Sequence, residues 1–430
     1  MPENGRSQWF YLHPHVHTCA KGSSGLLHDP LTGHTLEYTN EPAITELVAS
    51  LDGPDNLRVV DYADVSVTQP AVADFVDRVR ALHMGGLIDK KHSTGKPIQM
   101  TPRARVQRDP RKDTQDADIM LGEAVMGYVK EVTVHVNRVC ELDCSLCTSA
   151  YKQFRCCTRI EGGNEELDLA TIRNLLAELA SSGTMQVNMM GGDVFSYSRF
   201  EELIKLVEAS RFYATLHTHY LNLPETAAAL EILDARRWTM ELLVPMPVDR
   251  VRLAEALRKL RAAELPYIVH LVVETDDDLA EAEGLVDALG LVDSAVRPHF
   301  NGENLAFFEE NVFFTKDDVV AARPSPQDLY ASSRTNRLDF GRLVVLSTGE
   351  VFANPNNPKL GDLASTSVHK MLCHEVRRGE SWFRTRSCVK PCRDCVFQCM
   401  CPPISDYEHA IGRNNLCLAP PREVGELGAP

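Results

Sequence analysis

The sequence predicts an α/β fold: a partial (β/α)6 TIM-like barrel, preceded by a small α+β domain and followed by a cysteine-rich extension. Between about residues 128 and 310, apolar strand-like runs alternate with amphipathic helical segments, which indicates parallel βαβ units. Residues 1–89 form a separate set of short elements. The 13 cysteines are unevenly spread, with five in residues 140–157 and seven in residues 373–417.

The first 89 residues contain short strand-like segments followed by two helices. Asn40 and Pro42 are a typical cap and first-turn residue, so a helix is expected immediately after them. A second helix is expected from residue 72, where apolar residues recur at intervals of three and four. The strands are expected at 10–19, 25–28 and 34–38. Together these elements resemble a winged-helix peptide-recognition domain over residues 1–89.

Residues 90–127 are expected to link this unit to the barrel. The segment is rich in Lys and Arg and is broken by prolines at 97, 102 and 110. A solvated connector is the simpler interpretation. A groove for an acidic peptide is the alternative.

Six strand and helix pairs are expected in the predicted barrel, at residues 128–310. The strands are expected at 132–136, 185–190, 213–220, 240–244, 267–273 and just before residue 299. The helices are expected at 167–179, 200–209, 224–235, 251–262 and 279–289. In such folds the chemistry lies at the carboxyl ends of the strands.

Composition excludes several classes of protein. The chain has 430 residues and a net charge of −15, which argues against broad binding to nucleic-acid phosphates. It has no apolar run of about 18 residues, so no membrane span is expected. The N-terminus lacks a secretory pattern. Dense cysteine clusters in a long chain without a signal favour metal or redox chemistry in a reducing cytoplasm.

Three of the cysteines follow the first predicted barrel strand. Cys140, Cys144 and Cys147 have the spacing C-x3-C-x2-C. Three thiolates on one loop can hold three irons of a cubane cluster and leave the fourth iron open for a ligand. A structural zinc site is the alternative, with Cys156 or Cys157 as the fourth ligand.

This motif resembles that of the radical S-adenosylmethionine (SAM) superfamily. The resemblance covers roughly residues 128–310 and implies a [4Fe-4S] cluster on Cys140, Cys144 and Cys147. It also implies that the cluster binds SAM and cleaves it reductively to a 5′-deoxyadenosyl radical. The family usually has an aromatic residue before the third cysteine. Here the residue is Leu146, which is expected to pack on adenine.

A second match follows the second predicted strand, at Gly191-Gly192-Asp193. The family carries Gly-Gly-Glu here, and its backbone and carboxylate bind the methionine ammonium group. The resemblance therefore implies that Gly191, Gly192 and Asp193 bind SAM, with a shorter acidic side chain than usual. Glycines permit the close backbone approach that such a site needs.

The extension at residues 311–430 resembles the SPASM/twitch tail of peptide-modifying radical enzymes. The resemblance implies one auxiliary [4Fe-4S] cluster, with structural zinc as the alternative. Its ligands would be Cys392, Cys395, Cys401 and Cys417. A second auxiliary cluster is not expected, because the usual Gly-x4-Cys pattern reaches Asn354 from Gly349. Three further thiols could still build one: Cys373, Cys388 and Cys399.

Other polar residues are weaker candidates for the site. His217 and His219 share one face of the third barrel strand and could line the barrel or simply pack there. His299, Asn301 and Asn304 end the sixth strand and are open to the same two interpretations. Cys156 or Cys157 could donate a hydrogen atom to a peptide radical, or they could be ordinary loop thiols.

These resemblances imply an oxidoreductase that modifies a ribosomally made precursor peptide, by cross-linking, epimerisation or oxidation. The implied partners are the peptide and an electron donor such as flavodoxin or ferredoxin, with no nucleic acid and no membrane. One alternative is a sulfatase-type maturase, which acts on a folded protein and needs no leader-binding domain. Another is a non-catalytic iron–sulfur sensor that binds nucleic acid.

Overall fold

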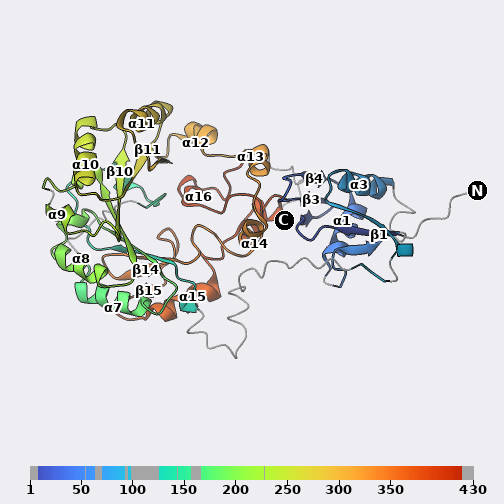
Figure 1. The fold of residues 1–430 in the computed structure, drawn as a ribbon, viewed down its shortest axis with the longest axis horizontal. Helices are drawn as coiled ribbons and strands as arrows, with labels where there is room; N and C mark the ends of the chain where they lie inside the picture. The colour runs from blue at the N-terminus through green and yellow to red at the C-terminus, as the bar shows by residue number, and fades with distance from the viewer. Residues whose placement is uncertain are drawn as a thin grey trace, which may run out of the picture.

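The computed structural model describes residues 8–53, 55–62, 70–92, 95–97, 125–142, 144–155, 166–226 and 228–418. The fold mixes helices and strands in two parts (Figure 1). A small N-terminal unit lies beside the cysteine-rich end of a larger α/β body.

The N-terminal unit contains two antiparallel sheets and two helices. One sheet has the order β5-β1-β6, and the other has the order β2-β3-β4. The strands are β1 (Gln8–Leu12), β2 (His17–Lys21), β3 (Ser24–His28), β4 (Thr35–Tyr38), β5 (Val59–Asp61) and β6 (Gly85–Asp89). The helices are α1 (Pro42–Asp52) and α3 (Pro70–Ala81). Phe10, Leu47 and Phe75 are fully or almost fully buried between them.

The single strand expected over residues 10–19 is two strands. A turn separates β1 from β2, and Val16 N donates to His13 O at 3.1 Å. Pro14 lies in this turn and has no N–H to donate to a ladder, which explains the break. Strands β5 and β6 were not predicted, because their partner in the sheet, β1, is distant in sequence.

The larger body is built on a nine-stranded sheet with the order β12-β11-β10-β9-β8-β7-β13-β14-β15. Six parallel strands follow in sequence order: β7 (Glu131–His135), β8 (Gln186–Met190), β9 (Tyr213–His219), β10 (Trp238–Pro245), β11 (Tyr267–Val273) and β12 (Ser294–Pro298). Strand β13 (Arg342–Val345) runs parallel to β7. The antiparallel strands β14 (Glu350–Phe352) and β15 (Gly361–Asp362) complete the sheet. Within the described residues the sheet is open, because β12 and β15 are its edges.

Helices connect the parallel strands. They are α6 (Ser145–Thr148), α7 (Leu169–Leu179), α8 (Phe200–Glu208), α9 (Ala228–Glu231), α10 (Arg250–Ala262) and α11 (Asp276–Leu289). The helix expected over residues 224–235 is only the four-residue α9. The Asp234 carboxylate accepts a hydrogen bond from Arg236 N at 3.0 Å, which stabilises a turn there instead of a further helical turn.

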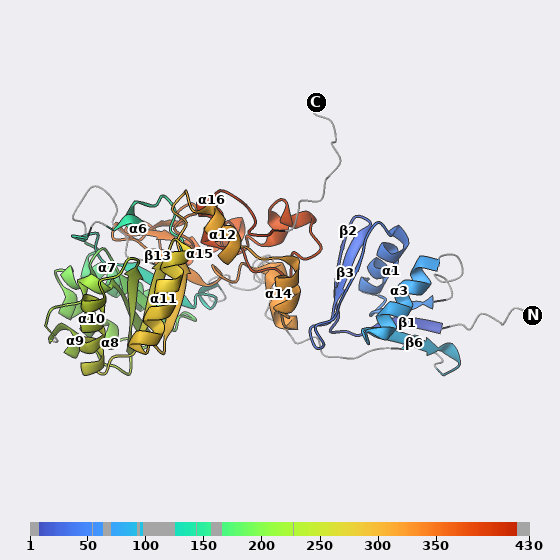
Figure 2. The same cartoon turned by 90° about the horizontal axis from the view of Figure 1, so that it is seen from above.

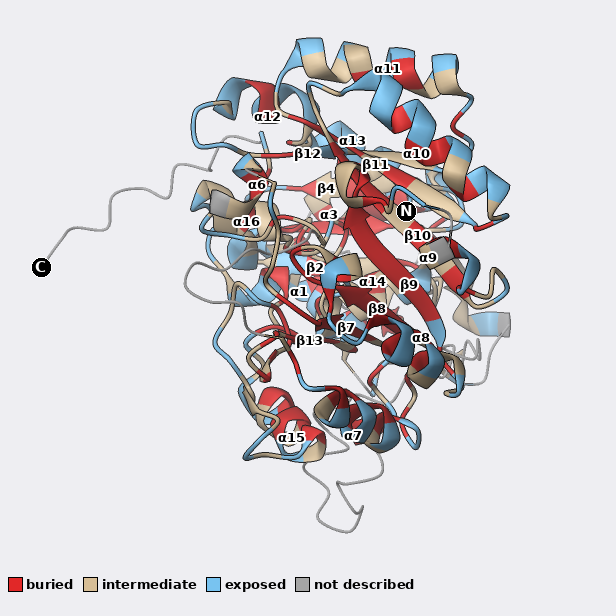
Figure 3. Cartoon of the chain, turned by 90° about the vertical axis from the view of Figure 1, so that its left-hand side faces the viewer, coloured by how far each residue is buried: buried red, intermediate tan, exposed pale blue. Residues whose placement is uncertain are grey.

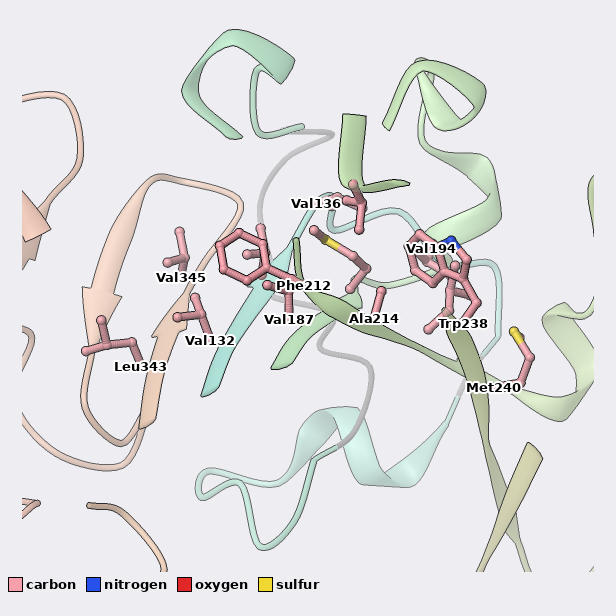
Figure 4. Close-up of a cluster of buried hydrophobic side chains, with 14 of the residues drawn as sticks. Val132, Val136, Val187, Val194, Phe212, Ala214, Trp238, Met240, Leu343 and Val345 are labelled. Carbon is pink, nitrogen blue, oxygen red and sulfur yellow. The ribbon is translucent and has the colours of Figure 1, made fainter. Parts of the chain in front are cut away.

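Apolar side chains gather on the face of the sheet that meets the helices. Val132, Val187, Ala214 and Met240 come from successive strands and lie together in Figure 4. Trp238 is fully buried in the same cluster. Figure 3 shows the strands largely buried, whereas α10 and α11 alternate between buried and exposed residues. This alternation is the 3.6-residue pattern of helices that cover a sheet.

Residues 299–418, which we call the C-terminal region, contain β13–β15 and several short helices joined by loops. The helices are α12 (Leu305–Asn311), α13 (Lys316–Ala321), α14 (Pro326–Arg334), α15 (Val368–Arg378) and α16 (Asp406–Ile411). In the described part of the chain, no helix is both long and apolar enough to cross a bilayer.

The N-terminal unit packs against this C-terminal region (Figure 2). Leu26 of β3 is fully buried against Leu329 and Met400. At the edge of the contact, Lys316 Nζ lies 2.6 Å from Glu37 Oε1. The cysteine-rich tail is therefore covered on one side by the sheet β2-β3-β4.

Candidate active site

The cysteine loop at residues 140–147 begins five residues after β7, at the carboxyl end of the parallel strands. Cys140 lies on the loop before α6, Cys144 occupies the N-cap position of α6 without a capping hydrogen bond from its side chain, and Cys147 lies within the helix. Cys147 N donates to Cys144 O at 3.0 Å, so the last two cysteines share one turn.

Asn137 joins the cysteine loop to the end of the neighbouring strand. Its side chain is fully buried, and its Nδ2 donates to Asp193 O at 2.7 Å and to Ser196 Oγ at 3.1 Å. Its Oδ1 accepts from Gly192 N at 3.1 Å. We call this set of contacts the Asn137 clamp. It brings the two sequence-predicted motifs, 140–147 and 191–193, side by side.

Gly191 and Gly192 are required by this close approach. A Cβ atom on Gly191 would lie 2.2 Å from Asn137 Oδ1. A Cβ atom on Gly192 would lie 2.2 Å from Val139 O. Both distances are far below van der Waals contact, so any larger residue would push the two loops apart.

Both the backbone and the side chain of Asp193 make hydrogen bonds in this structure. Its N donates to Val139 O, and its Oδ1 accepts from Phe195 N at 3.1 Å to cap a short 3₁₀ helix over Val194–Ser196. Burial raises the pKa of its carboxyl group, and the charge of Glu141 adds to this effect. The Asp193 side chain, which is shorter than the glutamate usual at this position, therefore also stabilises the loop that follows it.

The thiols of the cysteine loop face the ends of β9, β10 and β11. Asn222 Nδ2 donates to Cys140 Sγ at 3.6 Å. Burial lowers the pKa of His219 to about 4, and the nearby Cys147 thiol opposes this shift. Leu146 is 3% exposed and packs with Leu243 and Val272. Leu146 is thus held in an apolar contact beside the thiols.

The inner face of the sheet is polar, in contrast to the face that meets the helices. Strand register puts Thr133 beside Asn188, and Asn188 beside Thr215. Asn188 Nδ2 donates to Glu131 Oε1 at 2.6 Å. Arg155 Nη2 lies 2.8 Å from the same Glu131 atom. The buried polar groups of this face are therefore hydrogen-bonded to one another, as buried polar groups in folded proteins usually are.

A second polar set lies further along the inner face. Glu241 Oε2 lies 3.1 Å from His217 Nδ1 and 2.8 Å from His270 Nε2. Burial lowers the pKa of His217 to about 3. Burial alone would raise the pKa of Glu241, but the hydrogen bond from His270 and the nearby positive charges lower it to about 2. Sequence reasoning had found His217, but it missed Glu241 and His270.

Three polar residues after β12 are joined to Glu274 by hydrogen bonds. Glu274 Oε1 lies 2.8 Å from His299 Nδ1, and Glu274 Oε2 accepts from Asn301 Nδ2 at 2.8 Å. Asn304 Nδ2 donates to Glu274 O at 2.8 Å. These contacts fix the positions of His299, Asn301 and Asn304 at the end of β12.

The four cysteines predicted to hold the auxiliary cluster lie near one another. The Cys401 thiol is within electrostatic range of Cys392, Cys395 and Cys417, and its burial raises its pKa. Arg386 stands beside them, since its Nη1 lies 4.0 Å from Cys392 Sγ.

Arg386 also holds the backbone around these thiols. It donates to Pro402 O at 2.8 Å and to Asn414 O at 3.2 Å. Its charge pairs with Glu408 at 2.7 Å, and both side chains are almost fully buried. Arg386 and Glu408 were missed because an isolated Arg and Glu in a loop-rich tail carry no local signal.

The three spare thiols are dispersed. Cys373 lies 3.6 Å from His369 on α15, and Cys388 lies 3.5 Å from Phe383 O. Cys399 instead neighbours Cys19 of β2. Cys19 Sγ accepts a hydrogen bond from Gln398 Nε2 at 3.7 Å. Cys156 and Cys157 lie outside the described residues.

Neither cysteine set is a preassembled ligand cage. Across the residues that the structure describes, no three His, Cys, Asp or Glu side chains are arranged to hold a metal ion. The donor chemistry nevertheless fits iron–sulfur ligation, because both loops carry only thiols as soft donors.

Comparison with solved structures finds several similar chains. SuiB of Streptococcus suis, bound to the precursor peptide SuiA, matches with a TM-score of 0.49 and 11% identity, over 94% of this chain and 97% of that chain. Native anSMEcpe with bound AdoMet and Cp18Cys peptide matches with a TM-score of 0.47 and 12% identity, over 66% of this chain and 94% of that chain. BtrN in complex with AdoMet and 2-DOIA matches with a TM-score of 0.29 and 12% identity. No protein-family model and no curated protein matches the sequence. Likeness at this level carries no conclusion about activity.

Proposed function

We propose that this chain is a radical SAM enzyme that modifies a ribosomally synthesised peptide by hydrogen abstraction. The observation that carries the proposal is the Asn137 clamp. It joins the C-x3-C-x2-C loop to Gly191-Gly192-Asp193 at the carboxyl ends of β7 and β8. That edge is where parallel α/β sheets hold their ligands.

In this proposal each residue of the site has a separate role. Cys140, Cys144 and Cys147 hold a [4Fe-4S] cluster, which supplies the electron for cleavage of SAM when bound. The backbone of Gly191 and Gly192 and the carboxylate of Asp193 hold the methionine ammonium group. Leu146, buried against β10 and β11, offers an apolar surface for adenine and helps to exclude water.

The proposal extends to the other parts of the chain. The parallel strands β7–β12 act as the partial barrel. Residues 1–89 act as a winged-helix-like leader-binding domain, and residues 90–127 link the two. Residues 311–430 hold one auxiliary [4Fe-4S] cluster on Cys392, Cys395, Cys401 and Cys417. The proximity of these four thiols supports that cluster. An electron donor such as flavodoxin or ferredoxin would act on the chain in a reducing cytoplasm.

Iron and sulfide counts on anaerobically reconstituted protein test the clusters. We expect about eight irons in the wild type and about four in the triple variant Cys140→Ala, Cys144→Ala, Cys147→Ala, since each cubane holds four. Cys373→Ala is the matched control and should keep all of them. Twelve irons falling to eight would contradict the single auxiliary cluster.

Formation of 5′-deoxyadenosine from SAM and a chemical reductant tests the activity. We expect turnover in the wild type and in Cys373→Ala, and none in the triple variant. No 5′-deoxyadenosine from cluster-loaded wild-type protein would overturn the proposal and favour a sensor. If deletion of residues 1–89 left peptide modification intact, the leader-binding role would fall.

A further inference from the structure

A pocket of about 230 Å³ opens between β7, β13 and the C-terminal region. Its floor comes from the inner face of β7 and its roof from residues 150–155, directly after the cysteine loop. Met190, the residue before Gly191, also lines it. Sites for drug-sized ligands span about 300–1,000 Å³, so this pocket suits a single side chain.

Two adjacent residues in the middle of the roof, Lys152 and Gln153, are each held by a pair of amide hydrogen bonds. Gln153 Nε2 donates to Phe300 O, and Gln153 Oε1 accepts from Phe300 N, both at 2.7 Å. Asn356 makes the same kind of reciprocal pair with the backbone of Lys152, at 2.7 and 2.8 Å. These hydrogen bonds attach the roof to Phe300, after β12, and to Asn356, after β14. The position of the roof over the pocket is therefore fixed by the fold.

Two carboxyl groups form one wall of the pocket. Asn354 Nδ2 donates to Asp339 Oδ1 at 3.0 Å and to Asp406 Oδ1 at 2.7 Å, so both carboxylates share one amide. Burial raises the pKa of Asp339 to about 7, and the charge of Asp406 adds to this effect. Burial also raises the pKa of Asp406. Negative charge on this wall is therefore poorly compensated.

The cations around the pocket compensate this wall only in part: the charge of Arg342 lowers the pKa of both Asp339 and Asp406, but burial outweighs it. Arg155 lies 2.8 Å from Glu131, and Arg342 lies 3.3 Å from the same carboxylate. The charge of Lys152 acts on His135, on the floor of the pocket. Within the described ranges, neither Asp339 nor Asp406 has an ion-pair partner within 4.0 Å. The nearest cation, Arg342, is thus shared with Glu131 and makes no direct ion pair with this wall.

A buried imidazole faces the same space. His135 is 7% exposed and lines the pocket, and its Nδ1 has no hydrogen-bond partner. Burying a polar atom without a hydrogen-bond partner is unfavourable, so the unpaired Nδ1 points to a ligand that supplies the missing bond.

We propose that this pocket receives one cationic side chain, a lysine or an arginine of the peptide substrate, with its charge against Asp339 and Asp406. An ammonium or guanidinium group offers several N–H donors, which the two carboxylates and the neutral imidazole of His135 would accept. The inference rests on the proposed function, since it gives the substrate of that site a required chemistry. The cation would lie close to the cysteine loop, because the roof continues directly from α6.

Binding of small probes to the cluster-loaded, SAM-bound full chain tests this. The probes are N-acetyl-lysine methylamide, N-acetyl-arginine methylamide and N-acetyl-norleucine methylamide, whose uncharged side chain is that of lysine without its terminal amine; binding is measured by ligand-observed NMR titration. We expect one of the two cationic probes to bind at least about tenfold more tightly than the norleucine probe. Asp406→Asn should remove that preference, and Asp277→Asn, which removes an exposed carboxylate on α11, should keep it.

Comparison of the charged and uncharged probes on the wild-type protein tests the inference without any variant. Equal binding of the charged and uncharged probes, or preference for an added N-acetyl-glutamate methylamide, would overturn the inference. Formation of 5′-deoxyadenosine in the same preparation separates the two proposals. Turnover without probe preference refutes the pocket alone, whereas preference without turnover refutes the proposed reaction and leaves a cation-selective pocket.

Discussion

Replacement of Asn137 by alanine should both destabilise the protein and loosen the site. The side chain is fully buried and makes three hydrogen bonds, to Asp193 O, Ser196 Oγ and Gly192 N. A typical intramolecular hydrogen bond contributes about 1 kcal/mol net, so Asn137→Ala should lower the free energy of unfolding by about 3 kcal/mol. Ser196→Ala removes one of these three bonds and also the bond from Ser196 Oγ to Asp193 O, so it should cost about 2 kcal/mol.

Urea unfolding followed by tryptophan fluorescence measures this difference, because Trp238 is fully buried in the same core. The midpoint should fall at constant m-value, and more for Asn137→Ala than for Ser196→Ala. Amide hydrogen exchange at Gly192 gives a local measurement, and protection there should fall in Asn137→Ala. Equal losses in the two variants, or unchanged protection at Gly192, would refute the idea that Asn137 holds the two loops together.

Three further outcomes are expected. Gly192→Ala should abolish SAM-dependent 5′-deoxyadenosine formation, because its Cβ would lie 2.2 Å from a backbone carbonyl oxygen; Gly284→Ala, with nothing within 4 Å, is the matched control and should stay active. The folded pKa of His217, about 3, lies below its unfolded value of 6.5, so stability should fall as pH drops from 6.5 towards 3. A His217→Gln variant should flatten that part of the urea-midpoint profile, and an unchanged profile would contradict the assignment. Arg386→Ala should cost about 3–5 kcal/mol, because it leaves the Glu408 charge buried without its partner; a loss below about 1 kcal/mol in urea unfolding would show that the pair is solvated.

Local patterns in the sequence predicted the elements of the large body well. Strands β7 to β11 and helices α7, α8, α10 and α11 all lie within a few residues of their expected positions. Their apolar residues recur with the period of a strand or a helix, and that period depends only on near neighbours. Helix α9 is the exception, because the turn at Asp234 outweighs a weak helical pattern.

The order of the two motifs along the chain was also readable from the sequence. Both follow predicted parallel strands, and such strands present their carboxyl ends at one edge of a sheet. Their mutual distance was not readable. It depends on Asn137, a residue without a motif of its own, which reaches 55 positions along the chain to Gly192.

Long-range contacts were decided by the tertiary structure alone. Cys19 meets Gln398 across 379 positions, and β13 pairs with β7 to extend the sheet beyond the six expected strands. Asp339 and Asp406 come together only through Asn354.

Sequence alone therefore predicted the residues that the proposed function assigns to iron–sulfur clusters and SAM, because residue type and spacing are local properties. Tertiary structure decided which of them are neighbours, how the inner face of the sheet is charged and where a pocket remains. The physical reason is that burial, hydrogen-bond pairing and charge compensation are properties of packed elements, and packing joins segments that no local pattern connects.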